Sequence, residues 1–581
     1  MIKPLPPPAD QSWKILRLLQ TINLSHLLMT FTLLIVGFLT LYPVMMLLFG
    51  SVRSAPPGDA GNFTLEAYTE AYSDYSTYTI LLNSLVISGV KTILALLLGG
   101  FFAWVVTRTD TPYPRLLEVL ITLPFFIPPI LTAVAWAMLA NPTTGIINKF
   151  LMSVFGLESP PFNIYSYGGI VWHMTHYSTA FVFLLIIGAF RAMDPSLEEA
   201  SHASGASALR TFFRITLPLM LPAFMGAAIL TFIRGVEAFE SALFFGLPAK
   251  IFVFTTEIYS SLVHRTPPDY ARAMALAVTL MAITFILVLT QRRMMGGKEY
   301  FTITGKGYRP QVVKLGLWKW TTLGLCLAYF TAAVVLPISQ LILSSFFMIF
   351  GLYDLKMLTL ANYQQAFSDP TFWRALRNSL LLAIGGAGLC MFLSAIIAYI
   401  TFKTKFWGRA VLDHCSWVPW TVPGMVLALG MLWAYILLPG PVVLYGTFWI
   451  LLIAYLTLGL PIGVRSMAGT IVQISPDLEE CSLVHGATWW QTFVRIYLAL
   501  LRPGFTAGLM LLFFLFMREL SASVLLYSPG NEVLSVTILK YWEAGRSEVV
   551  SVIALVMLAV VLLFRVGETW LLRTKPSVAM T

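Results

Sequence analysis

Charged residues interrupt two long apolar stretches of this 581-residue chain. The five residues concerned are Arg234, Glu237, Glu240, Arg518 and Glu519. Ionisable side chains inside a membrane segment are costly and are functional candidates by default. A shift of 282 residues superposes Glu237 on Glu519. A helical rise of about 1.5 Å per residue puts both carboxylates roughly 24–28 Å from the start of their stretches, near Pro218 and Pro503. The two carboxylates predict an acidic mouth suited to a cation.

A structural interpretation of the same residues stays open. Arg234 and Glu237 are spaced i,i+3, so their charges could neutralise each other on one helix face. His173 and His176 have helical spacing that would suit a metal, but no carboxylate or cysteine accompanies them. A histidine pair with satisfied hydrogen bonds is the favoured interpretation, and we expect no metal site.

Gly296-Gly-Lys298 lacks the upstream glycine and the following Ser or Thr of a phosphate loop. We therefore expect no catalytic residue and no cofactor.

The composition indicates a membrane protein. Apolar residues make up 58% of the chain and charged residues 11%, and the mean hydropathy is +0.80. These values exclude an ordinary soluble protein. The net charge of +10 is spread over many short loops, so it indicates membrane orientation rather than nucleic-acid binding. The four cysteines have no paired spacing, which argues against a disulfide framework or a zinc site.

Apolar runs predict an all-α polytopic membrane protein with about 12 transmembrane helices, because roughly 20 apolar residues cross a bilayer. We expect spans near residues 27–50, 79–106, 116–140, 166–190, 218–245, 269–290, 320–346, 378–402, 411–438, 445–464, 501–527 and 550–571. The first apolar run is too long for a signal peptide and should remain as a span.

The chain repeats itself. Asn83-Ser84-Leu85 returns as Asn378-Ser379-Leu380, and at this shift of 295 residues Arg108 meets Lys403. Pro124 and Pro128 meet Pro419 and Pro423 at the same shift. An even number of spans in each half predicts two parallel halves related by a pseudo-twofold axis along the membrane normal. The halves are expected at 1–300 and 320–581, with a basic cytoplasmic linker at 301–319.

Each half also carries a polar loop, and the two loops have identical spacing. Loop 1 (194–218) contains Glu199, Ala200, Ser201, Gly205, Ile215, Leu217 and Pro218. Loop 2 (475–499) contains Glu480, Cys481, Ser482, Gly486, Ile496 and Leu498. Asp194 and Ser475 put capping side chains before prolines suited to a first helical position. The two glycines can end a helix in a left-handed conformation. Each loop therefore predicts a helix-turn-helix with a small-residue face at the membrane surface.

Both loops resemble the EAA loop of ABC importer permeases, E-A-A-x-x-x-G-x9-I-x-L-P, by which the membrane subunit docks on its ATPase. Loop 1 departs at Ser201, and loop 2 departs at Cys481, Ser482 and Ala499. The resemblance implies a fused two-half permease of the type I superfamily. It also implies a cytoplasmic ABC ATPase dimer and a periplasmic solute-binding protein as partners, with the chain itself embedded in the lipid bilayer. ATP hydrolysis would lie on a separate subunit, so the chain itself is not expected to be an enzyme.

The basic loops orient the chain. Short loops with Arg108 and Arg115 or Lys403 and Lys405 alternate with acidic ones such as that holding Asp59 and Glu66. The positive-inside rule then puts both termini and both polar loops in the cytoplasm. We therefore expect a multi-pass protein of the bacterial inner membrane.

The sequence indicates the class of transporter more clearly than it indicates the transported substrate. The segment from Phe516 to Pro529 and the linker segment Phe301–Pro310 are similar to the ferric-iron branch of these permeases. Phosphonates, sugar phosphates, thiamine and polyamines stay open as alternatives. A secondary transporter driven by an ion gradient, with Glu237 and Glu519 as ion sites, is a rival from another class, and a membrane scaffold is a third. The paired EAA-like loops favour the ABC importer.

Overall fold

The computed structural model describes residues 24–194, 196–295, 312–436 and 443–573. Within these ranges the chain is almost entirely helical, and its extended pairings are three isolated bridges. The all-α fold expected from the sequence is confirmed. The chain packs into two compact units. Unit 1 comprises Met1–Met45, Ile384–Trp420 and Tyr455–Phe513, and unit 2 comprises Met46–Ala383, Thr421–Ala454 and Phe514–Thr581. The division into halves at 1–300 and 320–581 stays a prediction, and most of the predicted linker lies outside the described residues.

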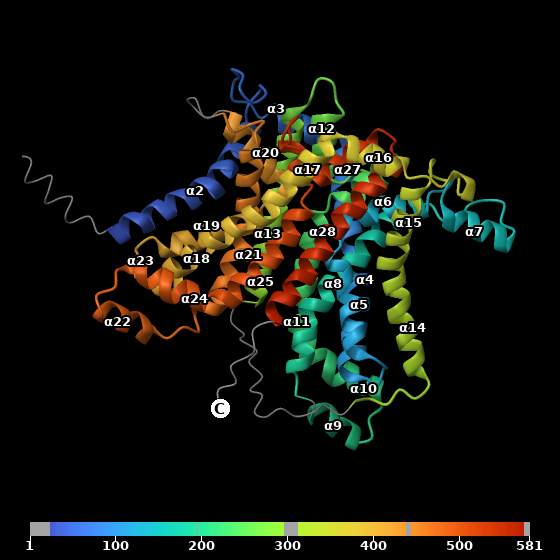
Figure 1. The fold of residues 1–581 in the computed structure, drawn as a ribbon, viewed down its shortest axis with the longest axis horizontal. Helices are drawn as coiled ribbons and strands as arrows, with labels where there is room; N and C mark the ends of the chain where they lie inside the picture. Colours follow the sequence, from blue (N-terminus) through green and yellow to red (C-terminus); the bar gives the residue numbers. More distant parts are fainter. Residues whose placement is uncertain (1–23, 195, 296–311, 437–442, 574–581) are drawn as a thin grey trace, which may run out of the picture. The chain divides into compact units, whose positions relative to one another are not determined.

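The helices follow one another through the whole described chain (Figure 1). They are α2 (Leu24–Ser51), α3 (Glu66–Ser73), α4 (Tyr75–Arg108), α5 (Pro114–Phe126), α6 (Pro129–Leu139), α7 (Ile146–Phe155), α8 (Tyr167–Ala192), α9 (Ser196–Ala203), α10 (Ala208–Thr211), α11 (Leu217–Val236), α12 (Phe254–Val263), α13 (Tyr270–Met295), α14 (Trp318–Phe330), α15 (Leu336–Phe346), α16 (Ala361–Ser368), α17 (Pro370–Leu380), α18 (Ala387–Lys403), α19 (Arg409–Thr421), α20 (Gly424–Ile436), α21 (Phe448–Ile471), α22 (Pro476–Val484), α23 (Trp489–Thr492), α24 (Leu498–Leu500), α25 (Arg502–Met517), α26 (Ser523–Leu526), α27 (Leu534–Glu543) and α28 (Ser547–Arg573). Single π-helical turns lie at Phe212–Thr216, Ala242–Gly246, Thr331–Val335, Leu381–Gly386 and Phe493–Tyr497.

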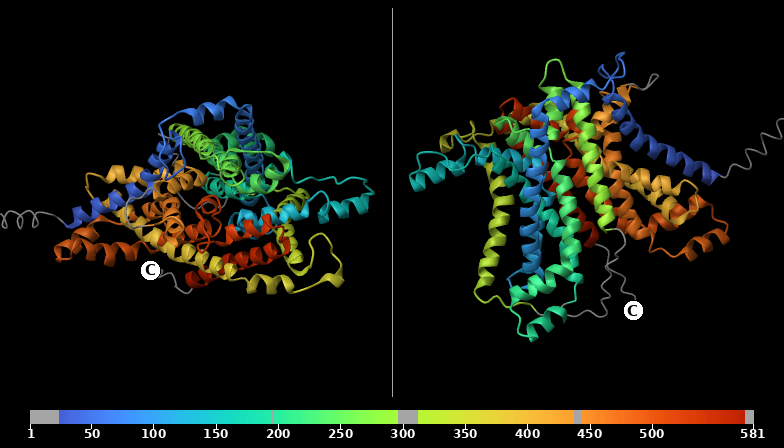
Figure 2. Two further views of the ribbon diagram at one scale, coloured as in Figure 1. Left: turned by 90° about the horizontal axis from the view of Figure 1, so that it is seen from above. Right: turned by 180° about the vertical axis from the view of Figure 1, so that it is seen from behind.

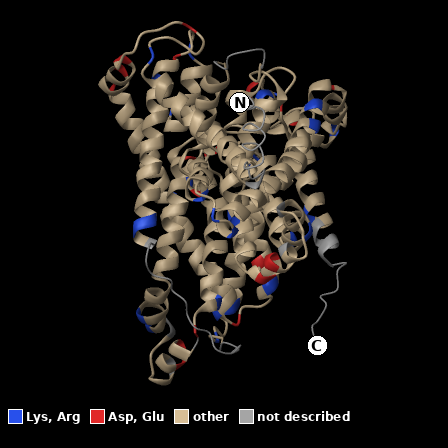
Figure 3. Cartoon of the chain, turned by 90° about the vertical axis from the view of Figure 1, so that its left-hand side faces the viewer, with Lys and Arg blue, Asp and Glu red and all other residues tan. Residues whose placement is uncertain are grey.

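Many of these helices are long and apolar enough to cross a membrane. Nine qualify among the described residues, and four bent helix pairs raise the number to 13 if each pair is one span. Charged residues are sparse along the helices and gather mostly at helix ends and in loops (Figure 3). The predicted number of 12 spans lies within this range of nine to 13.

Two predicted spans are broken. The expected continuous helices 116–140 and 411–438 instead bend by 92° between α5 and α6 and by 113° between α19 and α20. Each new helix starts at a proline or directly after one, at Pro128-Pro129 and at Pro423. Proline lacks the backbone N–H and forces the preceding residue out of the helical region, as Ile127 shows with ψ 127°. The breaks lie at the same repeat position, because 127 and 422 differ by the repeat shift of 295.

Two further spans end earlier than expected. The predicted helix 218–245 stops at Val236, and the predicted helix 501–527 stops at Met517. In both places the chain leaves the long helix and returns through a short one, α12 or α27. The apolar residues beyond each stop are therefore packed in a broken segment and do not extend the span.

In unit 2, α4 packs along α8 and α11. A Cβ on Gly99 would lie 2.8 Å from the side chain of Val182, so glycine permits this close approach. Lys91 is fully buried between the three helices, where its ammonium donates to the Thr231 carbonyl at 2.6 Å and to the Ser178 hydroxyl at 3.2 Å. The short helix α7, cyan in Figures 1 and 2, extends sideways from these long helices.

Unit 1 has a separate core. Side chains of α2, α18, α19 and α21 meet there, among them Val36, Ile397, Leu412 and Leu460, all with no exposed surface. Loop 2 connects α21 to α25 next to this core, whereas loop 1 belongs to unit 2.

The repeated Asn-Ser pair holds the returning helices in place within unit 2. The Asn83 amide donates to the Phe252 carbonyl at 3.0 Å, and the Ser84 hydroxyl accepts from the Phe254 amide at 3.0 Å. Asn378 donates to the Glu532 carbonyl at 3.0 Å, and Ser379 accepts from the Leu534 amide at 2.8 Å. The same two side chains therefore anchor the start of α12 and the start of α27.

Candidate functional site

Loop 1 folds as two short helices around a left-handed glycine. The Asp194 carboxylate accepts a hydrogen bond from the Ser196 amide at 2.9 Å and starts α9. This bond, with a weaker one from the Ser196 side chain, lowers the pKa of Asp194. Gly205 ends the helix with φ +82°, and the Ala206 amide closes the turn on the Ser201 carbonyl at 3.1 Å. This is the helix-capping arrangement that the sequence predicted.

Glu198, rather than Glu199, fixes loop 1 to the membrane helices. Its carboxylate forms an ion pair with Arg108 at 3.0 Å and accepts from the Thr216 hydroxyl at 2.5 Å. The Arg108 side chain is only 3% exposed, and its guanidinium also donates to the carbonyls of Phe190 and Met193 at 2.9 and 3.0 Å. One arginine therefore ties the end of α4 to the end of α8 and to α9.

Loop 2 repeats this scaffold with different side chains. Glu479 stands at the position of Glu198, and it accepts from the hydroxyls of Tyr399 at 2.6 Å and Tyr497 at 2.5 Å. Lys403, the counterpart of Arg108, donates instead to the Ile474 carbonyl at 2.6 Å. Gly486 has φ +79°, so the turn matches that of loop 1.

The serine that departs from the EAA pattern in each loop, Ser201 or Ser482, forms a hydrogen bond within its loop. The hydroxyls of Ser201 and Thr211 lie 2.9 Å apart, and those of Ser482 and Thr492 lie 2.9 Å apart. Each pair joins the two short helices of its loop. Sequence reasoning missed these bonds, although a serine followed by a threonine ten residues later occurs in both copies. Both loops also carry a π-helical turn, at Phe212–Thr216 and Phe493–Tyr497, which inserts one extra residue before the long helix.

The predicted loop residues lie at or near the surface of their loops. Exposed residues are Ala200, Gly205, Pro218, Glu480, Cys481 and Gly486, and half-buried ones are Glu199, Ser201, Ile215, Leu217, Ser482, Ile496 and Leu498. Leu197 and Leu478, at matched positions, are 47% and 45% exposed. The Oε1 atom of Glu199 is shielded from solvent without a hydrogen-bond partner among the described residues. Each loop thus presents small residues beside an exposed leucine.

The five charged residues of the apolar stretches come together in unit 2, where they form a cluster of mixed sign. Arg234 and Glu237 form an ion pair at 3.1 Å, the contact that the structural interpretation expected. Glu240, Arg234 and Glu519 all lie close enough to Arg518 to interact electrostatically. The Arg518 guanidinium also donates to the Phe125 carbonyl at 3.3 Å. Two arginines thus accompany the three carboxylates.

The superposition of Glu237 on Glu519 is wrong. The Glu237 amide bonds to the Ile233 carbonyl and the Ala238 amide to that of Gly235. The corresponding bonds in the second half run from Arg518 to Phe514 and from Glu519 to Phe516, a shift of 281 residues. Glu237 is therefore equivalent to Arg518, and Glu519 to Ala238. Thr255 and Ser535 follow the matched residues Phe254 and Leu534, which the repeated serines anchor. Their hydroxyls bond to the carbonyls of Ala238 and Glu519 at 2.8 and 2.7 Å, which supports the equivalence of Glu519 with Ala238.

The histidine pair has non-metal partners. The two ring nitrogens of His173 lie 2.7 Å from the Ser241 hydroxyl and 2.8 Å from the Thr132 hydroxyl. The His176 ring packs against Trp136 and Trp172 at centroid distances of 5.9 and 4.4 Å. His173 is therefore satisfied as the sequence favoured, whereas the buried Nδ1 atom of His176 has no hydrogen-bond partner among the described residues.

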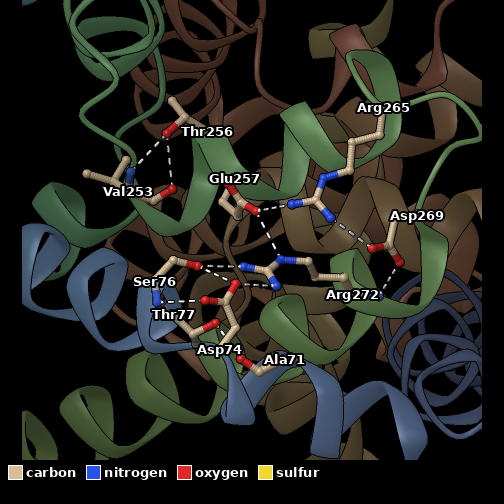
Figure 4. Close-up of polar contacts among 10 residues, drawn as sticks. All are labelled: Ala71, Asp74, Ser76, Thr77, Val253, Thr256, Glu257, Arg265, Asp269 and Arg272. Atoms are coloured by element: carbon tan, nitrogen blue, oxygen red, sulfur yellow. Dashed lines mark hydrogen bonds and ion pairs between the residues drawn. The ribbon is translucent and has the colours of Figure 1, made fainter.

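A network of ion pairs that sequence reasoning missed lies at the opposite end of α4 from loop 1 (Figure 4). Glu257, only 7% exposed, pairs with Arg265 and Arg272, both at 3.0 Å. Arg272 also pairs with Asp74 at 3.0 Å, and Arg265 with Asp269 at 3.1 Å. The second half has no such network among its described residues at this place; there Asp369, the counterpart of Asp74, accepts a hydrogen bond from Tyr541.

Comparison with known proteins shows to which family the chain belongs. The family model described as "Binding-protein-dependent transport system inner membrane component" matches residues 92–293 and 390–574, more than half of the chain, and each match contains one polar loop. The chain is 29% identical over 460 residues to a putative ferric transport system permease protein FbpB 1 of Haemophilus influenzae, covering 78% of this chain and 71% of that protein. It is 28% identical over 500 residues to the ferric transport system permease protein FbpB of Actinobacillus pleuropneumoniae, covering 84% and 71%. It is also 29% identical over 211 residues to the molybdenum transport system permease protein ModB of Escherichia coli K12, covering 36% and 89%.

Proposed function

Because the chain belongs to the family of binding-protein-dependent transport inner-membrane components, we propose that it carries ferric iron across the bacterial inner membrane. In this proposal a periplasmic binding protein delivers the solute, and a separate cytoplasmic ABC ATPase dimer docks on loops 1 and 2. Both termini then lie in the cytoplasm, as the basic loops favour. The chain itself hydrolyses no ATP.

The docking role rests on one observation, the two matched loops. Both have a capped first helix, a left-handed glycine, a Ser–Thr bond and a π-helical turn at a constant shift of 281 residues. A partner with two equivalent grooves needs two equivalent surfaces.

Substitutions in both loops test the docking. Glu199→Ala and Glu480→Ala together should abolish copurification of the ATPase subunit, while membrane insertion persists. Gly205→Asp should act alike, because a side chain with a Cβ is strained at φ +82°. Glu158→Ala, at an exposed carboxylate outside both loops, is the matched control. Normal ATPase recovery with the double variant would refute the docking role.

Iron is supported by the ferric permeases among the relatives and by the carboxylates of the charged cluster, Glu240 and Glu519 near Arg518 and Glu237 beside Arg234. A small trivalent cation cannot be desolvated without counter-charges. Glu237→Gln together with Glu519→Gln should therefore sharply reduce the uptake of labelled iron while the ATPase still copurifies. Unchanged uptake would leave these carboxylates as structural partners of the arginines.

An anionic substrate is the second candidate, and the two arginines of the cluster favour it. Guanidinium groups pair well with phosphate and similar oxyanions. For such a substrate Arg234→Gln together with Arg518→Gln should be the damaging pair, and the glutamate pair should be neutral or helpful. Uptake of labelled iron and of a labelled phosphonate by both double variants separates the two candidates.

A further inference from the structure

An apolar pocket of about 560 Å³ lies at the end of α15 in unit 2. Ile342, Leu343 and Phe346 of α15 form one wall, and Leu358 and Leu360 of the following segment form the other. Among its lining residues only Ser339 and Thr359 carry polar side chains. A volume of this size suits a small apolar ligand.

Hydrogen bonds hold the segment that forms the second wall of the pocket in place. The segment after α15 folds back as a hairpin, in which Met348 bonds to the Met357 carbonyl at 3.1 Å and Thr359 to the Phe346 carbonyl at 2.8 Å. The buried Asn362 amide donates to the carbonyls of Ser345 and Phe347 at 3.1 and 2.8 Å. The hairpin is also tied to α7, where the Lys149 ammonium donates to the Gly351 carbonyl at 2.6 Å.

The pocket continues the lipid-facing surface of a span. The helix from Trp318 to Phe346 is buried over only 39% of its most apolar window. Val335, Ile342 and Phe346 are 42%, 45% and 37% exposed, and their spacing of seven and four residues puts them on one helix face. This stripe runs directly into the pocket, so what covers the stripe also reaches the pocket.

The depth of the pocket matches a membrane interface. Trp318 and Trp320 are 70% and 57% exposed at the start of the span, as in an interfacial aromatic belt. Ile342 and Phe346 lie roughly 36–42 Å further along the helix at about 1.5 Å per residue, more than the ~30 Å of the hydrocarbon layer. The pocket therefore opens near the opposite headgroup level. Lys356, exposed on the hairpin two residues before Leu358, adds a cation there.

We propose that this pocket binds one acyl chain of a membrane phospholipid, whose phosphate lies near Lys356. The lipid fills the space between α15 and the hairpin and holds the hairpin at the membrane surface. This site is separate from loops 1 and 2 and from the charged cluster around Arg518, and it does not depend on the transported solute.

Photolabelling of the full-length protein in nanodiscs tests the proposal. The probe is phosphatidylglycerol with a diazirine on one acyl chain, and labelled peptides are mapped by mass spectrometry. Labels should concentrate on the pocket walls. Leu343→Trp fills the pocket and should reduce labelling there on the order of tenfold. The loss of only two buried methylenes of the acyl chain already weakens lipid binding by about this factor. Leu358→Trp, at a rim residue that is 53% exposed, should reduce it without disturbing the core.

Leu325→Trp is the matched control, because Leu325 is 51% exposed on the same span away from the pocket. It should leave labelling unchanged. Lys356→Gln should weaken labelling by phosphatidylglycerol, because it removes the ammonium beside the phosphate, and unchanged labelling would contradict this headgroup contact. Uniform labelling along residues 318–346, or unchanged labelling in both tryptophan pocket variants, would overturn the proposal. Protection of the hairpin by the binding protein, without lipid labels, would assign the pocket to that partner and equally overturn it.

Discussion

Loops 1 and 2 share a backbone but hold their carboxylates by different chemistry. Glu198 of loop 1 pairs with the buried cation Arg108, whereas Glu479 of loop 2 accepts from the neutral hydroxyls of Tyr399 and Tyr497. The scaffold bonds between Ser201 and Thr211 and between Ser482 and Thr492 are the same in both. The comparison teaches that the repeat preserves the shape of the loop and allows the anchor beneath it to change. Four predictions follow from it, in order of expected effect.

Arg108→Ala should cause the largest loss. It leaves the half-buried Glu198 carboxylate without its cation and leaves two carbonyls, those of Phe190 and Met193, without their donor. Breaking one partner of a buried pair costs about 3–5 kcal/mol. Hydrogen exchange should show loop 1 opening, and ATPase recovery should fall. Lys403→Ala, which removes one bond to the Ile474 carbonyl, should open loop 2 far less. Equal effects of the two substitutions would contradict the comparison.

The two glutamates should differ when only the charge is removed. Glu198→Gln loses the ion pair with Arg108 and should destabilise loop 1 by about 2–3 kcal/mol, the value of a hydrogen bond to a charged group plus desolvation. Glu479→Gln keeps one of the two oxygens to which the tyrosine hydroxyls donate, and its new amide NH2 can donate to the other hydroxyl, which is neutral. The cost should therefore stay near about 1 kcal/mol. Protection of loop amides against hydrogen exchange measures both. A larger effect at Glu479 would reverse our interpretation of the anchors.

Sequence alone predicts the local parts of these loops well. The left-handed glycines, the caps at Asp194 and Ser475 and the acidic first turns all depend on residues within one helical turn, and the structure confirms them. The pairing of Arg108 with Glu198 joins residues that are far apart in sequence, so no local pattern reveals it. The same holds for Glu257 with Arg265 and Arg272, which meet only because α12 returns beside α13.

The broken spans show a feature that hydropathy alone does not predict. Pro124, Pro128, Pro419 and Pro423 were visible as repeat positions, but an apolar count cannot separate a bent pair of helices from a straight one. The register of the charged cluster failed for a related reason. A shift of 282 matches two glutamates by residue type, whereas the backbone hydrogen bonds at the ends of α11 and α25 require 281. Geometry, not residue identity, decides which positions are equivalent.

The Ser–Thr bonds should have equal, moderate effects in the two loops. Ser201→Ala and Ser482→Ala each remove one hydroxyl pair of 2.9 Å and should cost about 1 kcal/mol. ATPase recovery should fall slightly and by the same factor, because the bond lies within each loop and not on its exposed face. Thr211→Ser and Thr492→Ser keep the hydroxyl and serve as controls. A loss confined to one loop would indicate that the scaffolds are not equivalent.

The smallest expected effect is a pH dependence that distinguishes the helix cap of loop 1 from that of loop 2. Hydrogen bonds from the Ser196 amide and hydroxyl lower the pKa of Asp194 from its ordinary 3.8. A carboxyl with a lowered folded-state pKa contributes stability above the unfolded pKa, and the contribution is lost as pH falls through the folded value. The start of α9 should therefore begin to fray below about pH 4. The cap of loop 2 is the Ser475 hydroxyl, which accepts from the Asp477 amide at 3.3 Å and does not titrate in this range. Hydrogen exchange of the first-turn amides should thus show an acid step at loop 1 that Asp194→Asn removes. If the step persists in Asp194→Asn, another group controls the start of α9, and the two caps do not differ in the way proposed.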